Sequence, residues 1–199
     1  MSRPDSAAPY TMLLPPGWTR VAVDDATDGV FSSLIEDVVG RAPSARRGAL
    51  RDMLTTAVRS ALASARSRRA IDLVLSFAEV EGLPLPASII TFPLEPPEDG
   101  RSAEETLVAL ARPGSRAVEI DGLPALRRVI DMPGDAGTPA HRAVHYIVHV
   151  PWQTRWLLFT ASILSSEDPG YGEVREALEA LVDAMIATVR FAKSQEAMG

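Results

Sequence analysis

Residues 144–150 read VHYIVHV and residues 156–163 read WLLFTASI, and these two stretches decide the fold. Both are apolar, both have polar or proline borders, and a short turn at 153–155 separates them, so the pattern predicts two adjacent strands. From residue 171 onward, apolar residues recur at steps of three, four and one. They are Val174, Leu178, Leu181, Val182, Met185, Ile186 and Val189. This spacing predicts a long amphipathic helix that lies against a sheet.

The second of these strands is apolar on both of its faces. Trp156, Leu158 and Thr160 alternate with Leu157, Phe159 and Ala161. A strand that is covered on two sides has this composition, so we expect it in the centre of the sheet.

The N-terminal half predicts a strand hairpin followed by two helices. Residues 10–14 and 18–23 flank the turn Pro15-Pro16-Gly17, which indicates a hairpin. Helical spacing predicts one helix over 27–41, and Pro43 stops it. Ser44 is expected to cap a second helix that reaches about residue 69.

The middle of the chain supplies further strands and one short helix. The expected elements are strands over 71–80, 87–94, 116–120 and 126–132 and a helix over 106–112. Pro93 favours an edge position or a bulge at the end of its strand. Ser102 and Glu105 match the capping-box pattern. Asp121-Gly122 indicates a hairpin, with Leu123-Pro124 expected to lengthen its loop.

Short turns between neighbouring strands predict antiparallel pairing. The sequence therefore predicts an α+β fold, with an antiparallel sheet of about six to eight strands, helices packed over it and an N-terminal helical elbow. We expect a single domain over 10–191, a disordered N-terminal tail over 1–9 and a C-terminal tail over 192–199.

Composition narrows the class of protein. The 199 residues carry a net charge of −6, which disfavours non-specific binding of nucleic acid. No cysteine is present, so disulfides and thiolate metal sites are excluded. The sequence has no apolar run long enough to span a bilayer, and we expect a cytoplasmic protein. Arginine outnumbers lysine 19 to 1, which is typical of a GC-rich genome such as that of an actinobacterium.

The two ends of the chain resemble those of the PsbP-like fold superfamily, which includes actinobacterial LpqN-like members. The resemblance is carried by the PPGW turn that ends at Trp18 and by the terminal helix that runs into Thr188-Val-Arg-Phe191. It implies a non-enzymatic binding or assembly role, and it carries over no catalytic residue. The helical elbow of 27–69 is longer than the usual insertion of that family.

The second expected helix is the best candidate for a partner-binding surface. Seven arginines and one aspartate lie between 44 and 70, which gives this segment a charge of +6. On a helical wheel, five of them share about a third of the circumference: Arg47, Arg51, Arg59, Arg66 and Arg69. This face would suit an acidic partner protein. The alternative is a solvated face whose arginines pair with the protein's own carboxylates.

Three histidines, His141, His145 and His149, follow one another at intervals of four. In a strand, His145 and His149 share a face but lie about 13 Å apart at ~3.3 Å per residue, too far for one ion. We therefore expect no metal site and no cofactor.

Catalytic signals are weak. Carboxylate pairs occur at Asp24/Asp25, Glu79/Glu81 and Glu104/Glu105, without other features of a sugar site. No nucleophile elbow, phosphate loop or dinucleotide fingerprint is present. A hydrolase whose residues assemble from distant positions stays a third hypothesis.

The terminal helix is expected to keep an acidic outer face. Its residues are Glu173, Glu176, Glu179 and Asp183. These would meet the arginine-rich helix within one chain or between two copies in a homo-oligomer.

The preferred hypothesis is a non-catalytic protein-binding domain: an adaptor, a secretion-associated chaperone or an immunity-type protein. The alternative is a small-molecule or lipid-binding protein with a pocket between the sheet and the helices. The apolar residues that would line this pocket are Phe31, Leu34, Ile35, Val38 and Val39.

Overall fold

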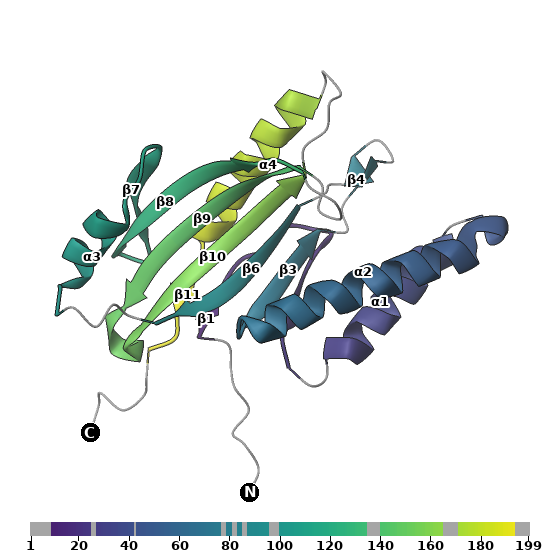
Figure 1. Ribbon diagram of the computed structural model, residues 1–199, viewed down its shortest axis with the longest axis horizontal. Helices are drawn as coiled ribbons and strands as arrows, with labels where there is room; N and C mark the ends of the chain where they lie inside the picture. The colour runs from purple at the N-terminus through teal and green to yellow at the C-terminus, as the bar shows by residue number, and fades with distance from the viewer. Residues whose placement is uncertain are drawn as a thin grey trace, which may run out of the picture.

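The structure is a computed structural model. It describes residues 9–24, 27–41, 43–76, 79–80, 83–84, 87–95, 100–134, 140–164 and 171–193. Seven antiparallel strands form the main sheet in the order β2-β3-β6-β10-β9-β8-β7 (Figure 1). In that order they span Trp18–Ala22, Asp72–Ser76, Ala87–Leu94, Arg155–Leu164, His141–Val150, Leu123–Met132 and Ser115–Ile120. The α+β fold and the expected number of antiparallel strands are confirmed.

The hairpin of β9 and β10 lies in the middle of the sheet, as its apolar sequence predicts. The turn between them is a short 3₁₀ helix, Pro151–Gln153, followed by Thr154 in the left-handed conformation with φ of 47°. Phe159 pairs with Tyr146, and β10 is flanked by β6 on its other side. Alternate side chains of β10 are therefore buried on one face of the sheet.

Helix α4, Tyr171–Ala187, covers that face and confirms the predicted terminal helix (Figure 1). Leu178, Val182, Met185 and Ile186 enter the largest core cluster, together with β10 residues such as Phe159. All of them are nearly or fully buried. Burial of a large apolar side chain stabilises a fold by about 1.5–3 kcal/mol, so this layer is the main source of stability.

The opposite face of the sheet is covered at its two ends by different helices (Figure 1). Near β2 and β3, Phe31 of α1 (Thr27–Arg41) and Leu62 of α2 (Arg47–Ser67) pack with Leu73. At the other end, Leu107 of α3 (Ala103–Leu110) packs with Trp156. The middle of this face carries half-buried side chains.

The two helices of the elbow are confirmed, but the expected cap is not. Ser44 lies inside a 3₁₀ turn, Ser44–Arg46, that leads directly into α2. Pro43 occupies the cap position of that turn and makes no side-chain hydrogen bond. The connection is therefore set by the proline corner rather than by a serine cap.

The predicted N-terminal hairpin is wrong. Strand β1, Tyr10–Thr11, pairs with β11, Arg190–Phe191, whereas β2 pairs with β3. The turn before Trp18 still forms, since the Trp18 amide donates to the Pro15 carbonyl at 3.1 Å. Prolines have no amide donor for a ladder, and the buried Tyr10 side chain directs β1 toward the C-terminal strand.

The strand expected over 71–80 is shorter in the structure. β3 ends at Ser76, and Glu79–Val80 (β4) pairs with Leu83–Pro84 (β5) in a separate small ladder. Strand β6 is central, but its end at Pro93 has a neighbouring strand on one side only, as the proline predicts. The pairing of β6 with β3 ends at Thr91, so Pro93 lies beyond the end of β3, where no amide donor is required.

Two local signals in the sequence are confirmed in detail. Ser102 and Glu105 form the predicted capping box at the start of α3, with hydrogen bonds of 2.8 and 3.2 Å. Asp121 and Gly122 form the turn between β7 and β8, both with positive φ. The loop has two residues, because β8 begins at Leu123, so its expected lengthening is wrong.

Candidate functional site

A groove of about 520 Å³ lies between α1 and α2. Phe31, Ile35, Val58 and Leu62 supply its apolar lining. Its charged lining residues are Asp28, Glu36, Arg51 and Arg59. The hairpin that carries this groove extends from the β3 side of the sheet (Figure 1).

Most of the five candidate arginines have partners within the chain. Arg51 makes a bidentate ion pair with Glu36 across the groove, with hydrogen bonds of 2.7 and 2.8 Å. The hydrogen bond from Arg51 lowers the pKa of the Glu36 carboxyl. Both side chains are well exposed, so the pair orients the two helices more than it stabilises them.

Arg66, Arg69 and Arg47 also have partners. Arg66 contacts Asp28 of α1 at 3.1 Å, and Arg69 forms an ion pair with Glu95 after β6. Arg47 donates to the Gly40 carbonyl at 3.0 Å. These contacts agree with the alternative interpretation, in which the arginines pair with the protein's own groups.

Arg59 differs from the other four. It is exposed, it lines the groove, and it has no hydrogen bond or ion pair with any residue that the structure describes. Arg68, which the candidate face did not include, is also exposed and without a partner in the described part of the chain. Arg59 is therefore the cation that the groove offers to another molecule.

The residues proposed to line an apolar pocket divide between the groove and the core. Phe31 and Ile35 line the groove. Leu34 packs against the cluster formed by β2, β3 and the two helices, and Val39 is buried. The cavity thus lies between the two helices rather than between the helices and the sheet.

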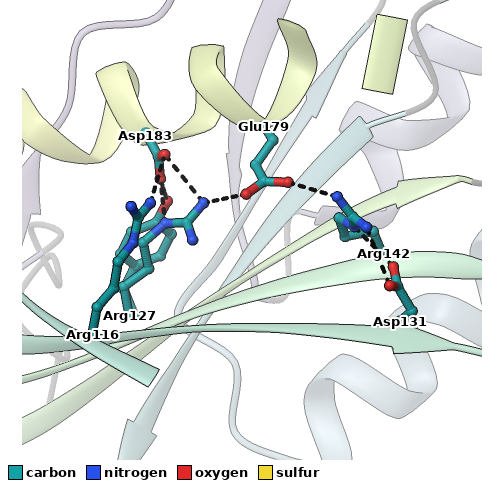
Figure 2. Close-up of polar contacts among 7 residues, drawn as sticks. Arg116, Arg127, Asp131, Arg142, Glu179 and Asp183 are labelled. Carbon is teal, nitrogen blue, oxygen red and sulfur yellow. Dashed lines mark hydrogen bonds and ion pairs between the residues drawn. The ribbon is translucent and has the colours of Figure 1, made fainter. Parts of the chain in front are cut away.

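Glu173 and Glu176 of α4 are exposed as predicted, but Glu179 and Asp183 face the sheet, so their predicted outward position is wrong. Figure 2 shows both carboxylates directed at arginines of the strands. Arg127 of β8 donates to Glu179 at 2.6 Å and to Asp183 at 2.7 Å. The arginine-rich helix α2 takes no part in these pairs. Among the described residues of one chain, the two charged helices therefore do not neutralise each other, and their contact between two copies stays a prediction.

Further groups extend this cluster along the sheet. Arg142 of β9 bridges Glu179 and Asp131, at 3.1 and 2.8 Å (Figure 2). The Tyr146 hydroxyl donates to Asp183. We call Arg127, Arg142, Tyr146, Glu179 and Asp183 the α4 cluster.

Burial and charge set the protonation of the α4 cluster. Burial alone would lower the pKa of Arg127, but its hydrogen bonds with Asp183 and Glu179 raise that pKa above its usual value. Burial and Asp183 raise the pKa of Tyr146. The arginine therefore stays charged and the tyrosine neutral across the physiological range, which suits a structural role.

A second polar cluster on the same face holds the N-terminal strand. The Tyr10 hydroxyl donates to Asp72 at 2.8 Å and lies 2.6 Å from the Thr91 hydroxyl. Arg20 donates to Asp72 through Nε at 2.9 Å and to the Tyr10 carbonyl at 3.0 Å. Burial raises the pKa of Tyr10 first, and the charge of Asp72 adds to the shift. Asp72 is 1% exposed, so this carboxylate is enclosed by its partners.

The histidines lie on one face of β9, as the strand assignment predicts. His149 packs against Trp156 with ring centroids 5.0 Å apart. Burial lowers the pKa of His149, and burial with the charge of Arg128 lowers that of His145. The described residues contain no group of three or more His, Cys, Asp or Glu that could hold a metal ion.

The carboxylate pairs do not form a described cleft. Asp25 and Glu81 lie outside the described residues. Glu105 is used by the α3 cap, and its neighbour Glu104 is exposed.

No protein-family model matches this chain, and no curated protein matches it. Among solved structures, the chain is similar to one titled "Protein Mog1 E65A mutant", with a TM-score of 0.45 and 12% sequence identity. The superposition covers 94% of this chain and 92% of the other. The α+β class rests on the sheet order and helix positions given above. Within the described ranges, no helix is long and apolar enough to cross a membrane.

Proposed function

We propose that this protein is a non-catalytic protein-binding domain whose α1–α2 groove receives an acidic segment of a partner protein. The observation that carries the proposal is Arg59, which has no partner among the described residues and lies in a groove that also exposes apolar surface. Ile35 and Val58 are half-buried there, so a partner could bury further apolar area beside the charge.

Charge complementarity sets the chemistry of the partner. The segment 44–70 is strongly basic, whereas the whole chain is acidic. Opposite charge on a partner raises the rate of encounter and fixes its orientation. An amphipathic segment with a carboxylate opposite Arg59 fits both features.

We also propose that the chain is a divergent PsbP-like domain. The support is that its N-terminal and C-terminal segments, which carry the resemblance, lie together, because β1 pairs with β11. We further propose that the domain acts in the cytoplasm of a GC-rich bacterium as an adaptor, a secretion-associated chaperone or an immunity-type protein. The arginine-rich composition supports the source.

The test is capture of the tagged protein from its host lysate, followed by native mass spectrometry of the complex. We expect a stoichiometric protein partner with the wild-type chain and its loss with Arg59→Glu. Arg69→Glu is the matched control, because Arg69 is an exposed arginine just beyond the end of α2 that already pairs with Glu95. Equal capture by the wild-type chain and Arg59→Glu would show that the groove is not the docking surface.

A further inference from the structure

A second surface of the sheet carries a cation, Arg128, that has no ion pair in the described part of the chain. Arg128 of β8 is half-buried, and its Nε atom is buried without a hydrogen-bond partner. No ion pair joins Arg128 to any residue that the structure describes. A buried donor without a partner destabilises the fold, and an acceptor from a ligand would satisfy it.

The strand register places polar groups beside this arginine. Arg128 lies opposite His145 of β9, which lies opposite Thr160 of β10. Directly opposed residues of antiparallel strands share a face, with Cβ atoms about 4.5–5.5 Å apart. Arg128, His145 and Thr160 therefore form a polar row, and the row lies on the face opposite α4, because Arg127 faces α4.

This face lacks negative charge at its centre. By the register, its residues on β6, β8, β9 and β10 include Arg128 and three histidines but no Asp or Glu. Burial and the charge of Arg128 lower the pKa of His145, so the imidazole is neutral at neutral pH. The row thus offers one positive charge and neutral hydrogen-bonding groups, which match a monoanion.

Apolar side chains border the row. Leu158 of β10 and Phe92 of β6 pair directly in the neighbouring row. Both are half-buried, and neither belongs to the three core clusters of the described residues. Helix α3 covers the sheet beyond Leu126, and the α1–α2 hairpin covers it beyond Ile90, so the surface between them is bounded on two sides.

We propose that this surface binds a small amphipathic carboxylic acid, with its carboxylate on Arg128 and its apolar body on Leu158 and Phe92. The guanidinium offers a planar fork that matches a carboxylate. His145 and Thr160 supply further hydrogen bonds. This site lies on the sheet, apart from the α1–α2 groove, so its test is independent of the test of the proposed protein partner.

The test is titration of the isotope-labelled full chain with sodium octanoate, followed by NMR. We expect saturable shifts at Leu158, His145 and the Arg128 Nε–H. 1-Octanol and octylammonium carry the same chain without the carboxylate and are expected to bind at least about tenfold more weakly, since a charge-assisted hydrogen bond is lost.

Arg128→Gln should weaken octanoate binding by about tenfold or more, by the same loss. Arg155→Gln is the matched control, because Arg155 is an exposed arginine on the other face of the same sheet. Absence of shifts at this face, equal binding of octanol, or equal binding by Arg128→Gln would overturn the proposal. Self-association of the chain through the same residues in sedimentation experiments would overturn it in favour of a second copy.

Discussion

Arg127 and Arg128 are neighbours in sequence but lie on opposite faces of β8, in opposite environments. The Arg127 side chain is 4% exposed and makes ion pairs with two carboxylates of α4. Arg128 is half-buried with no carboxylate partner among the described residues. Arg127 thus joins α4 to the sheet, whereas the guanidinium of Arg128 on the other face is available to bind a ligand.

The difference extends to the whole of each face. The face under α4 holds the largest core cluster and both polar clusters, each with its charges paired. The other face is covered only near its two ends, by α1–α2 and by α3. A fold needs one fully closed face for stability, so the open face is where binding can evolve at small cost.

The largest expected effect is the loss of Arg127. Arg127→Ala removes the cation between Glu179 and Asp183 and leaves both carboxylates close together. We expect a loss of about 3 kcal/mol in the free energy of unfolding, at the low end of the range for buried pairs because Asp183 is 36% exposed. Urea unfolding followed by circular dichroism measures it.

Arg128→Ala is the control for that comparison. Its side chain has no partner to lose among the described residues, and the variant removes a buried donor that lacks an acceptor. Any loss in the free energy of unfolding should therefore stay below about 0.5 kcal/mol, and a gain agrees with the assignment as well. Equal losses in the two variants would contradict the distinction between the faces.

The second effect concerns the polar cluster formed by Tyr10, Arg20, Asp72 and Thr91. Tyr10→Phe removes the hydroxyl shared by Asp72 and Thr91, both almost completely buried. We expect a loss of about 2 kcal/mol, as for a hydrogen bond to a buried charged group. Tyr146→Phe should cost less, about 1 kcal/mol, because Asp183 keeps Arg127. Thermal or urea unfolding of both variants measures the two losses in the free energy of unfolding. A larger loss in Tyr146→Phe than in Tyr10→Phe would contradict the prediction.

The framework of the fold could be predicted from periodicity alone. Strands β9 and β10 and helix α4 have long apolar patterns in which local preference and burial agree. The capping box of α3 and the turn at Asp121-Gly122 depend on a few adjacent residues, so they were predictable as well. Element identity follows from local chemistry wherever the segment is long or the motif is complete.

Pairing between distant segments could not be predicted in the same way. Strand β1 is two residues long, and its partner β11 lies at the other end of the chain. The signal for this pairing is the buried hydrogen bonding of Tyr10 with Asp72, which appears only once the sheet is assembled. A short strand takes its partner from tertiary contacts.

The candidate sites show the same limit. The charge of α2 is visible in sequence, but which of its arginines pair depends on Glu36, Asp28 and Glu95 from other elements. The inward direction of Glu179 and Asp183 had one available signal. Spaced four apart, they lie beside the apolar stripe of α4, where arginines of the neighbouring strands β8 and β9 can reach them.

A smaller effect is expected at Asp131, which lies next to the α4 cluster and pairs with its Arg142. Asp131 is mostly exposed, and its hydrogen bond from Arg142 lowers its pKa below the ordinary 3.8. Asp131→Asn should cost at most about 0.5 kcal/mol at neutral pH. Because the pKa of Asp131 is lower in the folded chain than in the unfolded chain, its ion pair stabilises the fold at pH values above the unfolded-state pKa. This stabilisation is lost as the pH falls through the folded-state pKa. Stabilities of wild type and variant should therefore converge in acid, and a difference that grows as pH falls would contradict the assignment.

The smallest effect tests the open face directly. Burial lowers the pKa of His145, and the charge of Arg128 lowers it further. Arg128→Ala should raise the pKa of His145 toward its ordinary value near ~6.5 while burial keeps it below. The pKa of His149 is lowered by burial alone and should not move. NMR titration of the histidine ring signals measures both in one sample.

The lowered pKa of His145 also predicts how the free energy of unfolding changes in acid. Because the folded-state pKa of His145 lies below that of the unfolded chain, the unfolded state takes up the proton first, and stability falls as pH drops below ~6.5. Arg128→Ala brings the folded-state pKa of His145 closer to its unfolded-state pKa. The variant should therefore lose less stability than the wild type between neutral and mildly acidic pH. An unchanged pKa of His145 would mean that the two side chains do not face one another, and the polar row that distinguishes this face from the α4 face would not exist.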